Sequence, residues 1–149
     1  MECTVNWTGR LATRSNMGFV AETGSGHTLV MDGAVNLDEP EFSGQDLAPR
    51  PLEMLLAVTG GCTAYDVVYI LRKGRHDVRG CSVKLTATRA DTEPKVFTLI
   101  NMHFTVSGKG ISEAAVKRAI ALSHDKYCSA SVMLGKTAQI TTSFEVHEA

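Results

Sequence analysis

The segment from about Pro51 to Lys73 constrains this chain more than any other, because it predicts one long helix that is apolar on nearly every face. Proline is tolerated in the first turn of a helix, where its missing N–H would have no partner. Gly74 suits the position that follows the last turn. A helix that is apolar all round is a buried helix. We therefore expect a central helix with the other elements packed around it.

Two adjacent glycines, Gly60 and Gly61, interrupt this helical segment. Each costs about 1 kcal/mol relative to alanine in a helix interior, so some other requirement must offset that cost. Two explanations are open. Either another backbone approaches the helix closely at this point, or the glycines give access to the neighbouring thiol of Cys62.

The segments on both sides of the helix alternate between apolar and polar residues, which predicts strands. Ser112 is a suitable N-cap for a second helix that runs to about Asp125. The resulting order is β-β-β-α-β-β-α-β, an α+β fold with mainly antiparallel sheets around the long buried helix. The predicted strands cover residues 3–8, 17–21, 27–31, 81–88, 96–106 and 138–146.

Length and composition indicate one globular domain, residues 1–149, with 44% apolar and 21% charged residues. The formal net charge of −1 argues against a nucleic-acid partner, which would favour a basic surface. The sequence contains no run of about 18 or more apolar residues free of charges, so we expect no membrane span. The N-terminus shows no basic region followed by an apolar stretch, so we expect a cytoplasmic protein.

The chain has four cysteines, Cys3, Cys62, Cys81 and Cys128, and none of them forms a C-x-x-C pair. In a reducing compartment, cysteines are more often free, catalytic or metal-binding than bridged. Cys3 and Cys81 lie on predicted strands and are interpreted as buried small hydrophobic residues. Cys62 lies inside the long helix and Cys128 follows the second helix, so only the fold can form a thiol pair from them.

Cys62 needs a partner if it is to react, because the thiolate is the nucleophile and burial alone raises the pKa of a thiol. Arg10, Arg14 and Arg50 are the candidate activating cations in the N-terminal half. Glu53, on the same helix, could orient such an arginine. The alternative interpretation is an unreactive core cysteine.

Cys128 follows His124 by four positions, which places both on one face if the helix extends that far. Cys128 could be a resolving thiol, a metal ligand or a His-activated nucleophile. Alternatively, Cys128 could lie at the end of a helix that packs on the core, with a structural role only. No metal site is expected, because zinc normally takes four ligands and no further cluster is evident.

Three segments together resemble the OsmC/Ohr family of osmotically inducible and organic-hydroperoxide-resistance proteins. They are PLEMLLA at 51–57, GGCTAYDV at 60–67 and KYCSAS at 126–131. The segments GSGH at 24–27 and VMD at 30–32 are similar to the branch with a Gly-Gly-Cys-Thr-Ala signature. The order of predicted elements agrees with this family over nearly the whole chain.

The resemblance implies an intertwined homodimer with active sites at the subunit interface and no cofactor. It assigns Cys62 as the thiol that attacks the peroxide and becomes a sulfenic acid. Cys128 then condenses with it to a disulfide, which a dithiol or a dithiol protein reopens. Arg10 is the position most similar to the activating arginine of the family. Glu53 lies one residue after the position of the family's activating glutamate.

The first hypothesis is therefore a thiol-dependent peroxidase that reduces organic hydroperoxides in oxidative-stress defence. The alternative is a non-enzymatic dimer of the same fold that senses redox state or binds a small apolar ligand. A third hypothesis is a metal-dependent hydrolase that uses His124 and Cys128.

Overall fold

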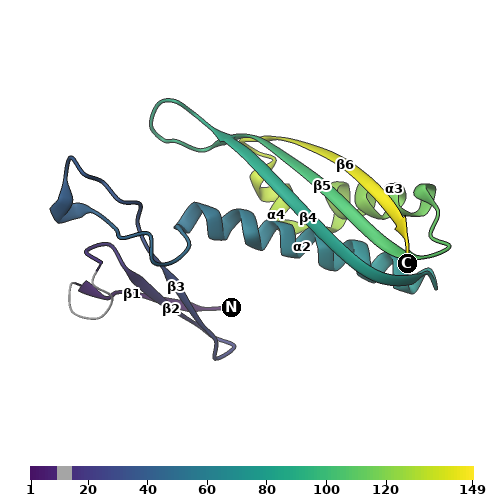
Figure 1. Ribbon diagram of the computed structural model, residues 1–149, viewed down its shortest axis with the longest axis horizontal. Coiled ribbons are helices and arrows are strands. Elements are labelled where there is room, and N and C mark those ends of the chain that lie inside the picture. The colour runs from purple at the N-terminus through teal and green to yellow at the C-terminus, as the bar shows by residue number, and fades with distance from the viewer. Residues whose placement is uncertain (10–14) are drawn as a thin grey trace. The chain divides into compact units, whose positions relative to one another are not determined.

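The computed structural model describes residues 1–9 and 15–149, which divide into two compact units, Met1–Leu55 and Leu56–Ala149. Each unit contains a three-stranded sheet. One long helix, α2 (Pro51–Lys73), begins in the first unit and continues through the second (Figure 1). Both ends of the predicted helix are confirmed. That the two units act as one domain stays a prediction.

The N-terminal unit is built on an antiparallel sheet of β1 (Cys3–Trp7), β2 (Phe19–Thr23) and β3 (Thr28–Met31), in that order. β2 and β3 pair antiparallel as a hairpin. There the Thr23 hydroxyl accepts a hydrogen bond from the backbone N–H of His27 at 3.1 Å. A short 3₁₀ helix, η1 (Pro40–Phe42), lies in the loop that leads to α2.

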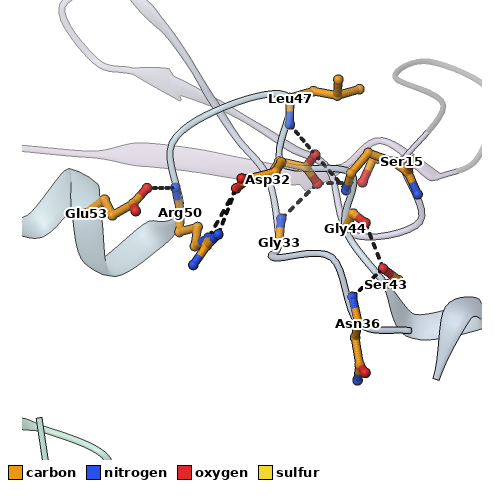
Figure 2. A network of polar contacts seen from close by, with 11 residues as sticks. Ser15, Asp32, Gly33, Asn36, Ser43, Gly44, Leu47, Arg50 and Glu53 are labelled. Atoms are coloured by element: carbon orange, nitrogen blue, oxygen red, sulfur yellow. Dashed lines mark hydrogen bonds and ion pairs between the residues drawn. The ribbon is translucent and has the colours of Figure 1, made fainter. Parts of the chain in front are cut away.

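A buried carboxylate, Asp32, holds this loop to the end of β3 (Figure 2). Its oxygens accept hydrogen bonds from the Ser15 hydroxyl and from three backbone N–H groups, those of Gly33 at 2.8 Å, Gln45 at 3.1 Å and Leu47 at 3.0 Å. Burial acts to raise the pKa of Asp32, but the hydrogen bonds together outweigh it and hold the pKa below its ordinary 3.8. The charged carboxylate is thus the form that the loop binds.

The same loop brings two backbones into direct contact at Gly44. A Cβ atom at this position would lie 1.9 Å from the carbonyl oxygen of Gly33. The N–H of Gly44 donates to the carbonyl of Ala34 at 3.0 Å. Only glycine permits this approach, because any side chain would overlap the facing backbone.

The C-terminal unit contains the larger sheet, with strand order β4 (Asp77–Arg89), β5 (Phe97–Lys109) and β6 (Gln139–Glu148). β4 and β5 pair antiparallel, whereas β5 and β6 pair parallel. A parallel pair needs a long crossover. Here it consists of α3 (Glu113–Leu122), a π-helical turn η2 (Ser123–Tyr127) and α4 (Ser129–Leu134).

The predicted α+β fold is confirmed, with one parallel pair in an otherwise antiparallel sheet. Ser112 caps α3 as predicted, and its hydroxyl accepts from the N–H of Ala115 at 3.2 Å. The predicted single helix to Asp125 is wrong at its end, because α3 stops at Leu122 and passes into η2. The short helix α4 has no counterpart in the sequence prediction.

The core of this unit lies between one face of the sheet and its helices, with α2 and α3 running along that face in Figure 1. Strand β5 alternates between buried apolar residues and partly exposed polar residues such as His103. The helices contribute one stripe each. The buried residues are Phe97, Ile100, Met102, Phe104 and Val106 on β5, Thr59, Gly60, Thr63, Val67 and Leu71 on α2, and Val116, Ala119 and Ile120 on α3.

Helix α2 was predicted to be buried on every side, and in the single chain this holds for one stripe only. On the other side Val58, Tyr65 and Tyr69 are 56%, 71% and 54% exposed. By length and composition alone, α2 is also the one described helix apolar enough to cross a membrane. That is weak evidence for a span, because core helices of soluble proteins meet the same criteria.

The two glycines of α2 have different surroundings. A Cβ on Gly60 would lie 2.6 Å from Cδ1 of Leu85, so this glycine lets the Leu85 side chain of β4 pack against the helix backbone. A Cβ on Gly61 would meet no atom within 4 Å. Gly60 thus allows a close approach, as predicted, but by a side chain of the sheet and not by another backbone.

We expect Asp32→Asn to lower the free energy of unfolding by about 2 kcal/mol at neutral pH, because it weakens several hydrogen bonds to a buried charge. The pKa of Asp32 is lowered in the folded state, so the carboxylate's contribution is complete above the ordinary value of 3.8 and is lost as pH falls through the folded pKa. The difference between the two proteins should therefore shrink below about pH 4.

Urea denaturation at pH 7 and at stepwise lower pH measures this difference. Asp38→Asn, an exposed carboxylate on the same loop, is the control and should change stability little. Equal stability of Asp32→Asn and the native protein at pH 7 would contradict the assigned role of Asp32.

Candidate functional site

The fold brings Cys62 and Cys128 together within the C-terminal unit. Cys62 lies on α2 and is partly exposed, whereas Cys128 caps the N-terminus of α4 and is 0% exposed. The two thiols are close enough to affect each other's ionisation, and Cys128 raises the pKa of Cys62. Their sulfur atoms and one carboxylate oxygen of Asp66 all lie within 4.8 Å of one another. The thiol pair that the sequence left open therefore exists in the structure.

Helix geometry and the crossover together position these groups. Cys62 and Asp66 are four residues apart on α2, so they lie on one helix face. Ser123, the first residue of the π-helical turn η2, donates its hydroxyl hydrogen to Oδ2 of Asp66 at 3.0 Å. The carbonyl of Ser123 accepts from the N–H of Cys128 at 2.8 Å. Ser123 thus connects both sides of the site, and π-helical turns often occur at functional sites.

Two backbone N–H groups of α4 act on the two thiols. The N–H of Ser131 donates to Sγ of Cys128 at 3.4 Å. The N–H of Ala130 acts to lower the pKa of Cys62. Such donors stabilise a thiolate more than a thiol.

The remaining surroundings oppose ionisation of Cys62. Burial raises the pKa of this thiol above its ordinary 9.0, and the neighbouring Cys128 and the negative charge of Asp66 raise it further. The Ala130 N–H lowers it only in part. None of the contributions to this pKa that come from the described residues is that of a cation. In this unit, therefore, Cys62 is held mainly as the thiol.

Exposure distinguishes the two thiols chemically. A solute in water can reach Cys62, while Cys128 is enclosed behind it. An oxidant would therefore meet Cys62 first, and Cys128 is placed to react with whatever forms there. A disulfide needs a sulfur separation of about 2.05 Å, so the two sulfur atoms, which lie within 4.8 Å of each other, would have to move closer to form one.

The other predicted site residues lie elsewhere or outside the described residues. Arg10 and Arg14 both fall in the part of the chain that the structure does not describe. In the N-terminal unit, the carboxylate of Glu53 accepts from the backbone N–H of Arg50 at 2.9 Å, and the Arg50 guanidinium pairs with Asp46 at 3.0 Å (Figure 2). Glu53 thus caps the start of α2, and a role for it or for Arg10 in activating Cys62 stays a prediction.

His124 and the remaining cysteines do not join the thiol pair. Nδ1 of His124 is buried without a hydrogen-bond partner among the described residues, and His124 is absent from the group formed by Cys62, Asp66 and Cys128. Cys3 is exposed on β1, so its interpretation as a buried residue is wrong for the chain by itself. Cys81 is half-buried on β4, and burial raises its pKa.

The sequence alone did not predict that Asp66 and Ser123 belong to the site. Asp66 carried a usable signal, because a carboxylate four residues after a helical cysteine must share its face. Ser123 and the N–H of Ala130 carried none, since their positions depend on where α3 ends and α4 begins.

An open groove of about 810 Å³ lies along the exposed side of α2. Tyr65 and Tyr69 stack there, with ring centroids 6.3 Å apart and planes 7° apart. Cys62 does not line this groove, but its neighbour in sequence, Gly61, does. The groove is lined by Gly61, Ala64, Tyr65, Val68, Tyr69, Arg72 and Lys73, so it is apolar with a basic end.

The comparisons with known proteins define the class. The family model described as OsmC-like protein matches residues 44–143, so the chain belongs to the OsmC-like family. Protein YhfA of Escherichia coli strain K12 is 46% identical over 146 residues, which is 98% of each chain.

Two solved structures show the same fold. A hypothetical protein from Aquifex aeolicus VF5 is 25% identical with a TM-score of 0.79, covering 99% of this chain and 96% of its own. An organic hydroperoxide resistance protein OsmC from Legionella pneumophila is 16% identical with a TM-score of 0.68, covering 98% of both chains.

The raised pKa of Cys62 predicts that its alkylation by iodoacetamide keeps accelerating beyond pH 9, because the thiolate fraction is still growing there. Asp66→Asn removes a nearby negative charge and should increase the rate at pH 8 several-fold. The rate is measured by mass spectrometry of the peptide that contains Cys62. Asp125→Asn, an exposed carboxylate of η2, is the control. A plateau reached below pH 8 in the native protein would contradict this prediction.

Proposed function

We propose that this protein is a thiol-dependent peroxidase that reduces organic hydroperoxides and acts in oxidative-stress defence. The observation that carries the proposal is the close pair of a partly exposed Cys62 and a fully buried Cys128, whose sulfur atoms lie within 4.8 Å of each other. A reacting thiol with a second thiol within reach completes a two-electron reduction without a cofactor.

The proposed cycle has three steps. The sulfur of Cys62 attacks the hydroperoxide oxygen, the O–O bond breaks, and Cys62 sulfenic acid and an alcohol form. The thiol of Cys128 then displaces the hydroxyl group, giving a Cys62–Cys128 disulfide and water. A dithiol, free or on a protein, reduces this disulfide and restores both thiols while becoming a disulfide itself.

The apolar groove on the helix that carries Cys62 supports an organic peroxide as substrate. Its apolar lining from Ala64, Val68 and the two stacked tyrosines suits a hydrocarbon group better than a small polar oxidant. The name of the Legionella pneumophila structure, an organic hydroperoxide resistance protein, points to the same substrate class.

A second candidate is a redox sensor with the same thiol chemistry and slow turnover. The raised pKa of Cys62 favours it, because a small thiolate fraction at neutral pH slows the first step. A fast peroxidase would need a cation from the N-terminal unit, Arg10 included, or from a second copy of the chain. The rate of the first step therefore separates the two candidates.

We also propose a cytoplasmic homodimer in which a second copy covers the exposed side of α2. Val58, Tyr65 and Tyr69 are exposed apolar residues there, and exposed apolar patches mark interaction sites. Pairing would bury these residues and close the groove along α2. Covering by another chain also explains why a helix this apolar has only one stripe buried in its own unit.

The peroxidase is tested by following cumene hydroperoxide and hydrogen peroxide consumption with dithiothreitol as reductant. We expect turnover with the organic peroxide to be faster, to be abolished in Cys62→Ser, and to fall to a single event in Cys128→Ser because the disulfide cannot form. Cys81→Ser, a half-buried cysteine away from the pair, is the matched control and should keep full turnover. Turnover no higher than in Cys62→Ser would reject the peroxidase and leave the sensor.

The homodimer is tested by size-exclusion chromatography with light scattering, which should give twice the mass of one chain. Val58→Glu places a charge in the apolar surface and should produce monomer. Lys117→Glu, on the exposed side of α3, is the control and should remain dimeric. If the native protein is a monomer, or if it sediments with phospholipid vesicles, then a second copy of the chain is not what covers α2.

A further inference from the structure

We propose that the reduced protein binds one thiophilic divalent cation, of the Zn²⁺ class, through Cys62, Cys128 and Asp66. The three ligand atoms come from two elements, α2 and the start of α4, and lie within 4.8 Å of one another. Two thiolates and one carboxylate form a donor set that zinc takes in proteins. The site does not depend on peroxidase activity, because it needs only the reduced thiols.

The separations suit a tetrahedral ion. With Zn–S bonds of about 2.3 Å and Zn–O bonds of about 2.0–2.2 Å, neighbouring ligand atoms lie about 3.5–3.8 Å apart. Ligand atoms that already lie within 4.8 Å of one another need to close by no more than about 1 Å, which rotation of the side chains can provide. The fourth position would face the partly exposed side of Cys62, where water can enter.

Each ligand already has the kind of support that metal ligands receive in proteins. The Ser123 hydroxyl binds Oδ2 of Asp66, which orients the carboxylate and leaves Oδ1 for an ion. The N–H of Ala130 favours the charged form of Cys62, and the N–H of Ser131 donates to Cys128. Donors of this kind stabilise the thiolates that coordinate a metal.

Charge gives the site a reason to prefer a cation. Two thiolates and a carboxylate whose ligand atoms lie within 4.8 Å of one another repel one another. A divalent ion supplies a compensating positive charge. On binding, each thiol loses its proton to solvent, so one ion enters and two protons leave.

The cation and the disulfide exclude one another, because the disulfide joins the two sulfur atoms that would bind the ion. Oxidation of the metal-bound form by two electrons converts both thiolates into one S–S bond and releases the ion. Diamide can accept those two electrons, with two protons from solvent, and become its hydrazine. The thiol pair would therefore bind the ion only while reduced.

The test uses the full chain, stripped of metal and reduced with a phosphine, under anaerobic conditions. Zn²⁺ is titrated by calorimetry, and Co²⁺ is used as a spectroscopic probe. We expect one ion per chain, a thiolate-to-cobalt absorption band, and loss of both after diamide treatment. Binding should weaken at least 100-fold in Cys62→Ser and in Cys128→Ser, and about 10-fold in Asp66→Asn and in Ser123→Ala.

Cys3→Ser and Cys81→Ser are the matched controls and should bind as the native protein does. Far-ultraviolet circular dichroism establishes that each variant is folded before it is titrated. Zinc binding that survives in Cys62→Ser, no thiolate-to-cobalt band, or equal affinity of the diamide-oxidised protein would overturn the inference. Peroxide turnover without zinc binding would reject this site alone, and zinc binding without turnover would reject only the proposed peroxidase.

Discussion

One residue, Ser123, connects α2 to the second thiol. Its hydroxyl donates to Asp66 on α2, while its carbonyl accepts from the N–H of Cys128. Docking the crossover onto α2 and positioning Cys128 therefore involve the same residue. The π-helical turn that begins at Ser123 ends just before Cys128, whose extended backbone separates this turn from α4.

The site combines requirements that work against each other. Cys128 is fully enclosed, and the burial of Cys62 itself, the neighbouring Cys128 and the carboxylate of Asp66 raise the pKa of Cys62. Fast attack on a peroxide requires the opposite. A cation would reconcile them, whether it is an arginine from another part of the assembly or a metal ion. The chemistry of this thiol pair is thus decided by which positive charge reaches it, and an arginine would favour turnover while a metal would favour storage of the reduced form.

The long helix could be predicted at both ends because Pro51 and Gly74 are strong local signals that need no tertiary contact. Alternation likewise located the strands, since burial on one face of a sheet has a period of two. The end of α3 could not be predicted, because Ser123–Tyr127 is polar and compatible with more helix. Cys62 and Cys128 were identified by their motifs, whereas Asp66 became visible as a member of the site only once the crossover was placed. Arg10 lies outside the described residues, so its predicted role in activation is unchanged.

The glycine pair before Cys62 shows how α2 serves two surfaces at once. Gly60 faces the sheet, where Leu85 occupies the space that a side chain would fill. Gly61 lies about 100° further round the helix, where it lines the open groove. Alanine in both places would favour the isolated helix, by about 1 kcal/mol per residue. The helix is thus less stable in isolation, but Leu85 of the sheet packs closely against it at Gly60 while the space at Gly61 stays open. The same helix therefore packs against the sheet on one face and carries a partly exposed Cys62.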